Sequence, residues 1–277
     1  MNNAPETKQS AAIYGMGIVS ALGLGTGSVW QALSSGQCGI RPLPAGADFA
    51  CEGAARLSEK DEQTLFAAWA DQFPEQPTAS RALAMAWHAA QQALVRIPGE
   101  LKSECALILS TTKACQRALM QAAADSDSGE AALYLPGELA RRLAERLQIS
   151  GPVYAVSNAC ASGLVALSQA TRAIECDALH AALVVGVDEV ADFVLGGFSS
   201  LKALSGPPCT PYDQNRSGLS LGEGAAAMFL APHGGLRQDD DSAAAALAQL
   251  PRPLALYAGW GTTNDANHIT GPARDGR

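Results

Sequence analysis

Residues 151–176, GPVYAVSNACASGLVALSQATRAIEC, have the pattern of a strand, a tight turn of small residues and a helix. We expect the strand over 151–157 and the helix over 161–176, with Cys160 in the turn between them. The unpaired N–H groups and the dipole at a helix N-terminus stabilise a thiolate, and the same N–H groups can hold an oxyanion when a thioester is attacked. Cysteine is also among the most often buried residues. From this stretch alone, a nucleophile and a core thiol are about equally well supported.

The segments on either side of this unit alternate in type. Continuous apolar runs predict strands at 11–20, 105–110 and 178–190, and apolar residues at helical spacing predict helices at 28–36, 78–97 and 136–149. Thr78 or Ser80 is positioned to cap the second of these helices. Strands that alternate with helices indicate a layered α/β domain.

Gly15 and Gly17 form a Gly-x-Gly pair near the end of the first expected strand. In a dinucleotide-binding fingerprint a third glycine follows, but Ser20 occupies that place here, and no acidic residue ends a following strand. We therefore interpret the pair as a structural glycine turn and expect no nucleotide cofactor.

Composition limits the class of partner. The chain has 277 residues, 48% of them hydrophobic, which is enough for one large core or two smaller ones. Its formal net charge is −8, so nucleic acid and anionic membranes are unlikely partners by charge alone. Arg141, Arg142 and Arg146 fall close together, and we interpret them as a solvated helix face.

Cysteine and histidine usage gives no sign of a disulfide framework or a metal site. The seven cysteines are odd in number and include no Cys-x-x-Cys pair, which fits reduced thiols in a cytosolic protein. The four histidines show no ligand spacing, so no metal is expected. The polar N-terminus does not resemble a signal peptide, and no apolar run approaches the roughly 20 residues that span a bilayer. We expect a soluble, cytoplasmic protein.

The segment SNACASG resembles the nucleophile motif of β-ketoacyl-acyl-carrier-protein synthases, the elongating condensing enzymes with the thiolase fold. Other segments resemble the same family in the right order: IYGMGIVSALGLG with WQALSSGQCGI, VVGVDEV, GGFSSLKALS, TPYDQNRSGLSLGEGAAAMFL and GWGTTNDANHITGP. The resemblance implies a thiolase-like layered α/β fold (αβαβα), of which this chain holds mainly the N-terminal half.

The resemblance also implies a decarboxylating Claisen condensation. Cys160 would accept an acyl group from an acyl carrier protein as a thioester, and the carbanion from malonyl carrier protein would attack it to give a 3-oxoacyl product. Such a reaction elongates fatty-acid, polyketide or polyene chains. Its substrates travel on the phosphopantetheine of the carrier protein, so no further cofactor is expected. The implied partners are acyl carrier protein and a second ketosynthase chain, in a homodimer or heterodimer formed through residues 181–190, AALVVGVDEV.

Two residues are candidates for binding the acyl group. Phe198 matches the family position that lines the acyl tunnel beside the cysteine, although an ordinary core aromatic fits the sequence equally well. Lys113 lies in STTKACQ, residues 110–116, where many fatty-acid enzymes carry an uncharged, glycine-rich stretch. Burying a lysine unpaired is costly, so Lys113 either points to solvent or lines the pocket. In the pocket it would favour shorter or more polar acyl groups.

By the resemblance, residues 1–253 form the N-terminal ketosynthase domain and 254–277 begin the C-terminal half, truncated here. The family's two carbonyl-polarising histidines and their lysine belong to that half, and none of the four histidines matches their motifs; we give His268 a structural role. This chain alone is therefore expected to lack condensation activity. A noncatalytic half-length partner subunit, or a remnant of a condensing enzyme, is the alternative. An enzyme that takes coenzyme A esters is a third reading, which the Gly-Glu-Gly-Ala signature disfavours.

Overall fold

The computed structural model describes residues 10–44, 46–116, 135–234, 241–264 and 266–267, so His268 lies outside the described residues. Of the helices within these ranges, none has the length and apolar character needed to cross a membrane.

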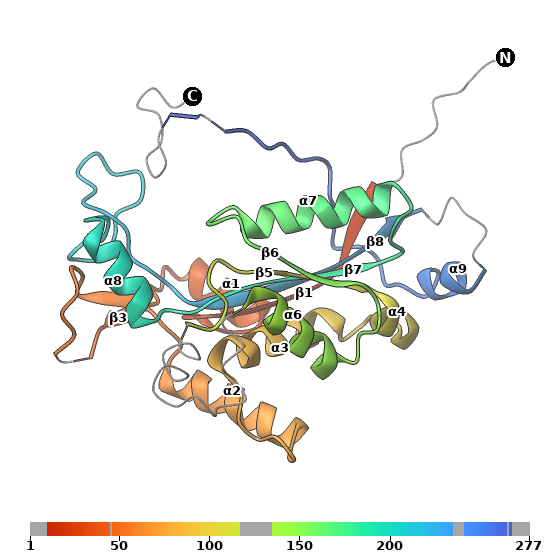
Figure 1. Ribbon diagram of the computed structural model, residues 1–277, viewed down its shortest axis with the longest axis horizontal. Coiled ribbons are helices and arrows are strands. Elements are labelled where there is room, and N and C mark those ends of the chain that lie inside the picture. The colour runs from red at the N-terminus through yellow and green to blue at the C-terminus, as the bar shows by residue number, and fades with distance from the viewer. Residues whose placement is uncertain (1–9, 45, 117–134, 235–240, 265, 268–277) are drawn as a thin grey trace.

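A mixed seven-stranded sheet lies at the centre of the described chain (Figure 1). Its strands run in the order β2-β1-β8-β7-β5-β6, and β9 also pairs with β1. Their bounds are β1 Ser10–Ser20, β2 Gly23–Leu24, β5 Ala106–Ser110, β6 Val153–Val156, β7 Ala182–Asp188, β8 Gly224–His233 and β9 Ala255–Leu256. β5, β6 and β7 are parallel, whereas β8 is antiparallel to both β7 and β1. β1 therefore runs in the same direction as the parallel group. A separate small sheet pairs β3 (Ile40–Pro42) with β4 (Gly53–Ala55).

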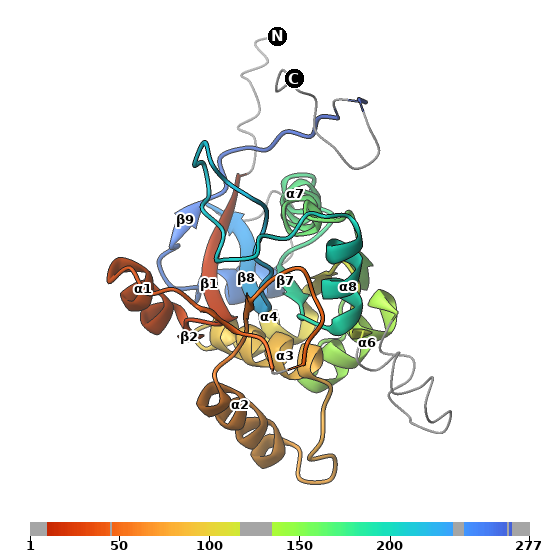
Figure 2. The same ribbon diagram turned by 90° about the vertical axis from the view of Figure 1, so that its left-hand side faces the viewer.

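Helices cover both faces of the large sheet. In Figures 1 and 2, α7 (Ser162–Glu175) lies on one side of the strands, and α3 (Arg81–Leu94) and α6 (Pro136–Leu147) lie on the other. The remaining helices are α1 Thr26–Ser34, α2 Glu59–Gln72, α4 Gly99–Glu104, α8 Asp192–Ser200 and α9 Asp241–Leu247. This arrangement confirms the layered α/β fold expected from the alternating elements.

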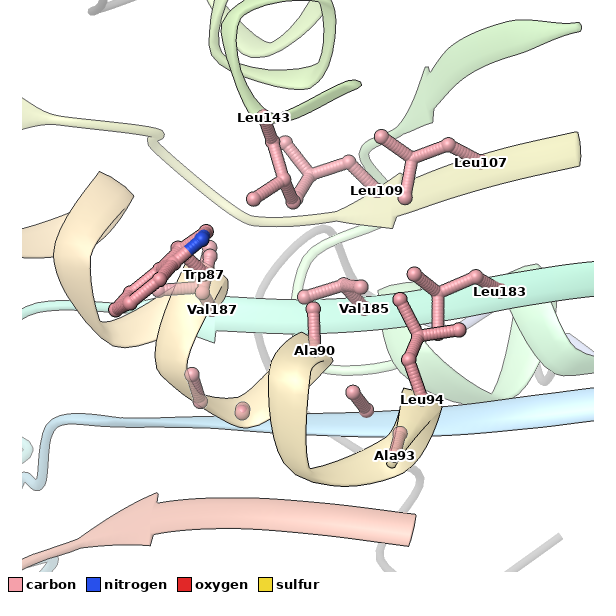
Figure 3. Packing of buried hydrophobic residues seen from close by; sticks show 14 of the residues in the cluster. Trp87, Ala90, Ala93, Leu94, Leu107, Leu109, Leu143, Leu183, Val185 and Val187 are labelled. Atoms are coloured by element: carbon pink, nitrogen blue, oxygen red, sulfur yellow. The ribbon is translucent and has the colours of Figure 1, made fainter. Parts of the chain in front are cut away.

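Each face of the sheet has its own apolar core. On the α3 and α6 side, side chains from β5 and β7 such as Leu109 and Val185 pack against Trp87 and Leu143 (Figure 3). On the α7 side, the intervening strand residues, including Ile108, pack against residues of the helix. Because both faces are covered, β5 and β7 read as continuous apolar runs rather than as alternating ones.

Most of the expected elements are confirmed within a few residues of their ends. The expected strands correspond to β1, β5, β6 and β7, and the expected helices to α1, α3, α6 and α7. Ser80, and not Thr78, caps α3: its hydroxyl accepts a hydrogen bond of 3.2 Å from the Leu83 N–H. Among the described residues from 254 onward, only β9 joins the sheet. The helices α2 and α8 and the strand β8 had no counterpart among the expected elements.

The glycine turn expected at Gly15 and Gly17 is wrong, because β1 runs through both residues. The two glycines instead allow α3 to lie directly on the strand. A β-carbon on Gly15 would lie 1.9 Å from the Ala93 carbonyl oxygen, and one on Gly17 would lie 2.0 Å from that of Ala89. The chain turns later, at residues 21 and 22 between β1 and β2, and Gly23 directly after this turn has a φ of +132°.

Association with a partner chain through residues 181–190 cannot use strand pairing by β7. β7, which spans most of that segment, is hydrogen-bonded to β5 on one side and to β8 on the other. Both of its edges are therefore used within the sheet. β6 pairs only with β5 among the described strands, so β6 offers an open edge.

The arginines of α6 differ in their surroundings. Arg141 and Arg142 pair with Glu138 on the outer surface, as expected of a solvated face, and the hydrogen bond from Arg141 lowers the pKa of Glu138 to about 2. Arg146 instead lies 5.0 Å from the ring centroid of Phe73, so it packs α6 against the end of α2. All three arginines therefore make contacts within the chain: two form ion pairs along α6, and the third packs against an aromatic ring.

Replacing Gly17 with alanine should destabilise the protein by at least about 2 kcal/mol, because the new methyl group overlaps the α3 backbone, which cannot move without disturbing the core. Urea unfolding followed by circular dichroism would measure the loss. Gly27→Ala is the matched control, because nothing lies within 4 Å of a β-carbon at that position on α1. Equal midpoints for the two variants would contradict the close contact between β1 and α3.

Candidate active site

Cys160 lies in the turn that joins β6 to α7, directly before the N-cap residue Ala161. Its side chain is exposed, so it does not occupy a core position. The preceding residue, Ala159, has a φ of +46°, a left-handed conformation that residues other than glycine seldom adopt. The turn therefore holds some backbone strain at the residue next to the thiol.

Ser162 fixes this turn from within. Its hydroxyl is buried, accepts a hydrogen bond of 2.8 Å from the Asn158 N–H and donates one of 2.6 Å to the Ala159 carbonyl. The Asn158 N–H and the Ala159 carbonyl are thus both tied to the first residue of α7. The result is a rigid turn that presents Cys160 at its outer side.

The N-terminus of α7 lies next to the turn that carries Cys160. Within the described ranges, no side chain caps the first turn of the helix. The Ala161 and Ser162 N–H groups already donate to the Asn158 and Ala159 carbonyls. The positive end of the helix dipole therefore acts on the charge that develops near Cys160. A thiolate or a thioester oxyanion is the kind of charge that this environment stabilises.

The strand ends bring distant segments to the same edge of the sheet as Cys160. β1, β5, β6 and β7 all end there because they run in the same direction, and the antiparallel β8 begins there. A hollow of about 410 Å³ lies at this edge, lined by Ser20, Ser110, Asp188 and Gly224 together with Cys160. Ligands of open parallel sheets commonly bind at this position.

A second hollow of about 480 Å³ also reaches Cys160. The two hollows share part of their lining, namely Thr112, Ala159, Cys160, Asp188 and Gly222. Cys160 therefore stands where the two spaces meet, and each gives access to the same sulfur atom.

The second hollow brings together all three residues singled out from the sequence. Cys160, Lys113 and Phe198 line it, although they come from three different parts of the chain. The Lys113 ammonium lies 5.6 Å from the centroid of the Phe198 ring, a cation–π contact that contributes about 0.5–2 kcal/mol. Phe198 lies on α8 and is half-buried, so it is not an ordinary core aromatic. Lys113 is also half-buried and lines the hollow rather than extending freely into solvent.

The loop that carries Lys113 is held in place by Asp188, at the end of β7. The Asp188 carboxylate accepts hydrogen bonds from the Thr111 hydroxyl (3.0 Å), the Thr112 N–H (2.9 Å) and the Thr112 hydroxyl (2.8 Å). Ala114, on the other side of Lys113, is buried with a φ of +50°, and its N–H donates to the Thr111 hydroxyl at 2.9 Å. The backbone at Lys113 is thus fixed on both sides.

Glu223 anchors the opposite wall. Its buried carboxylate accepts hydrogen bonds from Arg81 at 2.6 Å (Nη2) and 3.1 Å (Nε), and from the Leu57 N–H at 3.0 Å. Its glycine neighbours Gly222 and Gly224 line the hollows beside Cys160. Neither Arg81 nor Glu223 was among the site residues predicted from the sequence. A glutamate between two glycines, next to an apolar run, could have marked Glu223 as a site residue.

Within the described residues, no three or more histidine, cysteine, aspartate or glutamate side chains lie close enough together to hold a metal ion.

Comparison with known proteins identifies relatives along most of the chain. A family model for the N-terminal domain of β-ketoacyl synthases matches residues 8–234. The chain is 28% identical to 3-oxoacyl-[acyl-carrier-protein] synthase 2 of Vibrio harveyi over 295 residues, which cover 98% of this chain and 66% of the relative. It is 33% identical to nodulation protein E of Rhizobium meliloti over 143 residues, 51% of this chain and 33% of the relative. The chain thus spans between a third and about two thirds of these relatives.

Among solved structures, the ishigamide ketosynthase/chain length factor superimposes with a TM-score of 0.79 at 25% sequence identity. The superposition covers 98% of this chain and 67% of that one. The layered fold described above is therefore the fold of the N-terminal part of a ketosynthase.

The exposure of the cysteines predicts their order of alkylation. Iodoacetamide should modify the exposed Cys160, Cys38 and Cys176 first, because the reagent reaches an exposed sulfur atom directly. Cys105 should resist, since burial raises the pKa of its thiol to about 12. Peptide mass spectrometry over a time course would rank the sites. Modification of Cys105 before Cys160 would contradict the described geometry.

Proposed function

The chain belongs to the β-ketoacyl synthase family, and on that premise we propose that Cys160 is the acyl-accepting nucleophile of a 3-oxoacyl-acyl-carrier-protein synthase. The observation that carries the proposal is the position of Cys160, exposed at the α7 N-terminus where two hollows meet. A condensing enzyme brings two substrates to one sulfur atom, and two hollows at that atom suit such a reaction.

In the first step, the Cys160 thiolate attacks the carbonyl carbon of an acyl thioester on the phosphopantetheine of acyl carrier protein. The new C–S bond forms first and places the negative charge on the carbonyl oxygen. The old C–S bond then breaks, and the carrier thiolate leaves and takes up the proton that Cys160 gave up. The positive end of the α7 dipole stabilises the oxyanion of the intermediate.

In the second step, malonyl carrier protein loses carbon dioxide, and the resulting carbanion attacks the acyl-Cys160 carbonyl. A C–C bond forms, the Cys160 thiolate leaves, and the product is a 3-oxoacyl chain of a fatty acid, a polyketide or a polyene. None of the chain's four histidines matches the family's histidine motifs. We therefore assign the acylation step to these 277 residues.

The second hollow is the proposed acyl pocket, with Phe198 and Lys113 as substrate-binding residues. Both side chains line it together with Cys160, and apolar residues such as Val194 and Leu221 supply further walls. An acyl chain attached to Cys160 would bury its methylene groups against these side chains, at about 0.8 kcal/mol for each CH₂.

Acyl transfer to the intact chain tests the proposal. Incubation with octanoyl acyl carrier protein should add one octanoyl group, found by peptide mass spectrometry on Cys160. Cys160→Ala should abolish the adduct, whereas Cys176→Ser, a change at another exposed cysteine, should leave it unchanged. An octanoyl group on another residue of the wild-type chain, or on none, would refute the assignment of the nucleophile.

The proposal places a second ketosynthase chain, identical or related, along the open edge of β6. The Leu107 and Thr111 N–H groups donate to the Pro152 and Val156 carbonyls, so alternate residues of β6 face β5. Ala155 has the other parity, and its N–H and C=O face outward. These outward groups are available for pairing with a strand of the partner chain.

Ala155→Pro should convert the dimer to a monomer, because proline removes an outward N–H while leaving the hydrogen bonds from β5 to β6 intact. Sedimentation velocity would measure the change, and circular dichroism would verify the fold. Ala155→Ser keeps the N–H and is the control, expected to remain dimeric. A proline variant that sediments as the wild type would exclude β6 as the contact.

A noncatalytic partner subunit is the second candidate function. The open edge of β6 supports it, since strand pairing needs no reactive thiol. The octanoyl experiment separates the two, because a noncatalytic subunit would dimerise without acylation of Cys160.

A further inference from the structure

We infer that Lys113 selects acyl groups that carry a neutral oxygen function, such as a ketone or a hydroxyl, over fully saturated chains of the same length. The inference rests on the proposed function, in which Cys160 receives the acyl group and the second hollow holds it.

The walls of this hollow differ in polarity. Val194 and Phe198 offer apolar surface, whereas Lys113, Gln116 and Glu189 are polar residues in the same lining. A saturated chain would displace water from the polar side without replacing its hydrogen bonds, which costs free energy. An acyl chain with an oxygen on it restores one of those bonds.

Lys113 is the donor that remains available. Among the described residues it forms no salt bridge, and its ammonium contacts the face of the Phe198 ring at 5.6 Å from the centroid. An ammonium has three N–H donors, and one aromatic face does not occupy them all. Gln116 is engaged differently, because its side-chain N–H donates to the Lys113 carbonyl.

The position of the ammonium is prepared before any substrate arrives. Asp188 holds Thr111 and Thr112, and the left-handed Ala114 fixes the chain on the other side of Lys113. The contact with Phe198 then holds the side chain at α8. A donor that is already in place loses little conformational entropy when it binds, and therefore discriminates well.

The charges around the hollow favour a neutral oxygen over a second carboxylate. Asp188 and Glu189 line the same space as Lys113, so two acidic residues stand near one ammonium. A carboxylate on the acyl chain would lie in the same hollow as two acidic residues and be repelled by them, whereas a ketone or hydroxyl would not. The substrate class is then an oxygen-bearing acyl thioester, as produced by an earlier condensation whose keto group has not been fully reduced and removed.

The test compares matched acyl donors on the full 277-residue chain. Equal concentrations of octanoyl-pantetheine and a mono-oxo-octanoyl-pantetheine, with the ketone placed in turn at positions along the chain, compete for Cys160, and mass spectrometry gives the ratio of the adducts. The wild-type chain should favour at least one oxo donor, and Lys113→Met should lower that ratio roughly tenfold. Comparing variant with wild type cancels the intrinsic reactivity of each donor.

Lys202→Met is the matched control, because Lys202 is exposed and does not line the hollow; it should keep the wild-type ratio. Lys113→Arg should retain part of the preference. If Lys113→Met leaves every ratio unchanged while Cys160 is still acylated, the role of Lys113 is wrong and the proposed function stands. If neither donor acylates Cys160, the proposed function fails, and the inference fails with it.

Discussion

The buried carboxylate of Glu223 is the constraint on which the site depends. Its side chain is fully shielded from water and is satisfied by Arg81 at the start of α3 and by backbone N–H groups of Leu57 and Val190. Removing one partner from such a pair costs about 3–5 kcal/mol, because the other charge is left buried and unpaired. Glu223 thereby ties the start of β8 to α3, to the segment before α2 and to the residues after β7. The wall beside Cys160 keeps its shape because these four segments share one anchor.

Asp188 anchors the other wall of the site, which carries Lys113. It accepts hydrogen bonds from Thr111 and Thr112, so the loop after β5 is held against the end of β7. Neither carboxylate needs to exchange a proton in the proposed reaction. Both act as fixed acceptors for loops that would otherwise have many conformations, and loops held in this way can place a side chain such as Lys113 reproducibly.

The close contact between β1 and α3 sets the geometry of the layers. Gly15 and Gly17 remove two side chains from the strand, and the alanines of α3 remove bulk from the helix, so that the backbones meet. Periodicity predicted both elements but could not reveal that they touch, because a glycine in a strand and a glycine in a turn look alike in the sequence. The same limit applies to residues 181–190: the sequence could not show that both edges of β7 are paired, since sheet order is not encoded in any single strand.

The sequence by itself determined the strand–turn–helix unit around Cys160, the layered α/β class and the family, because these depend on local periodicity and on motifs that are contiguous along the chain. The tertiary structure alone decided that Cys160 lies between two hollows, that Lys113 lies against Phe198, and that Arg81 meets Glu223. The residues in each of these contacts are separated by many positions along the chain. They meet because the parallel strands end at one edge of the sheet, and only the order and direction of the strands specify that edge.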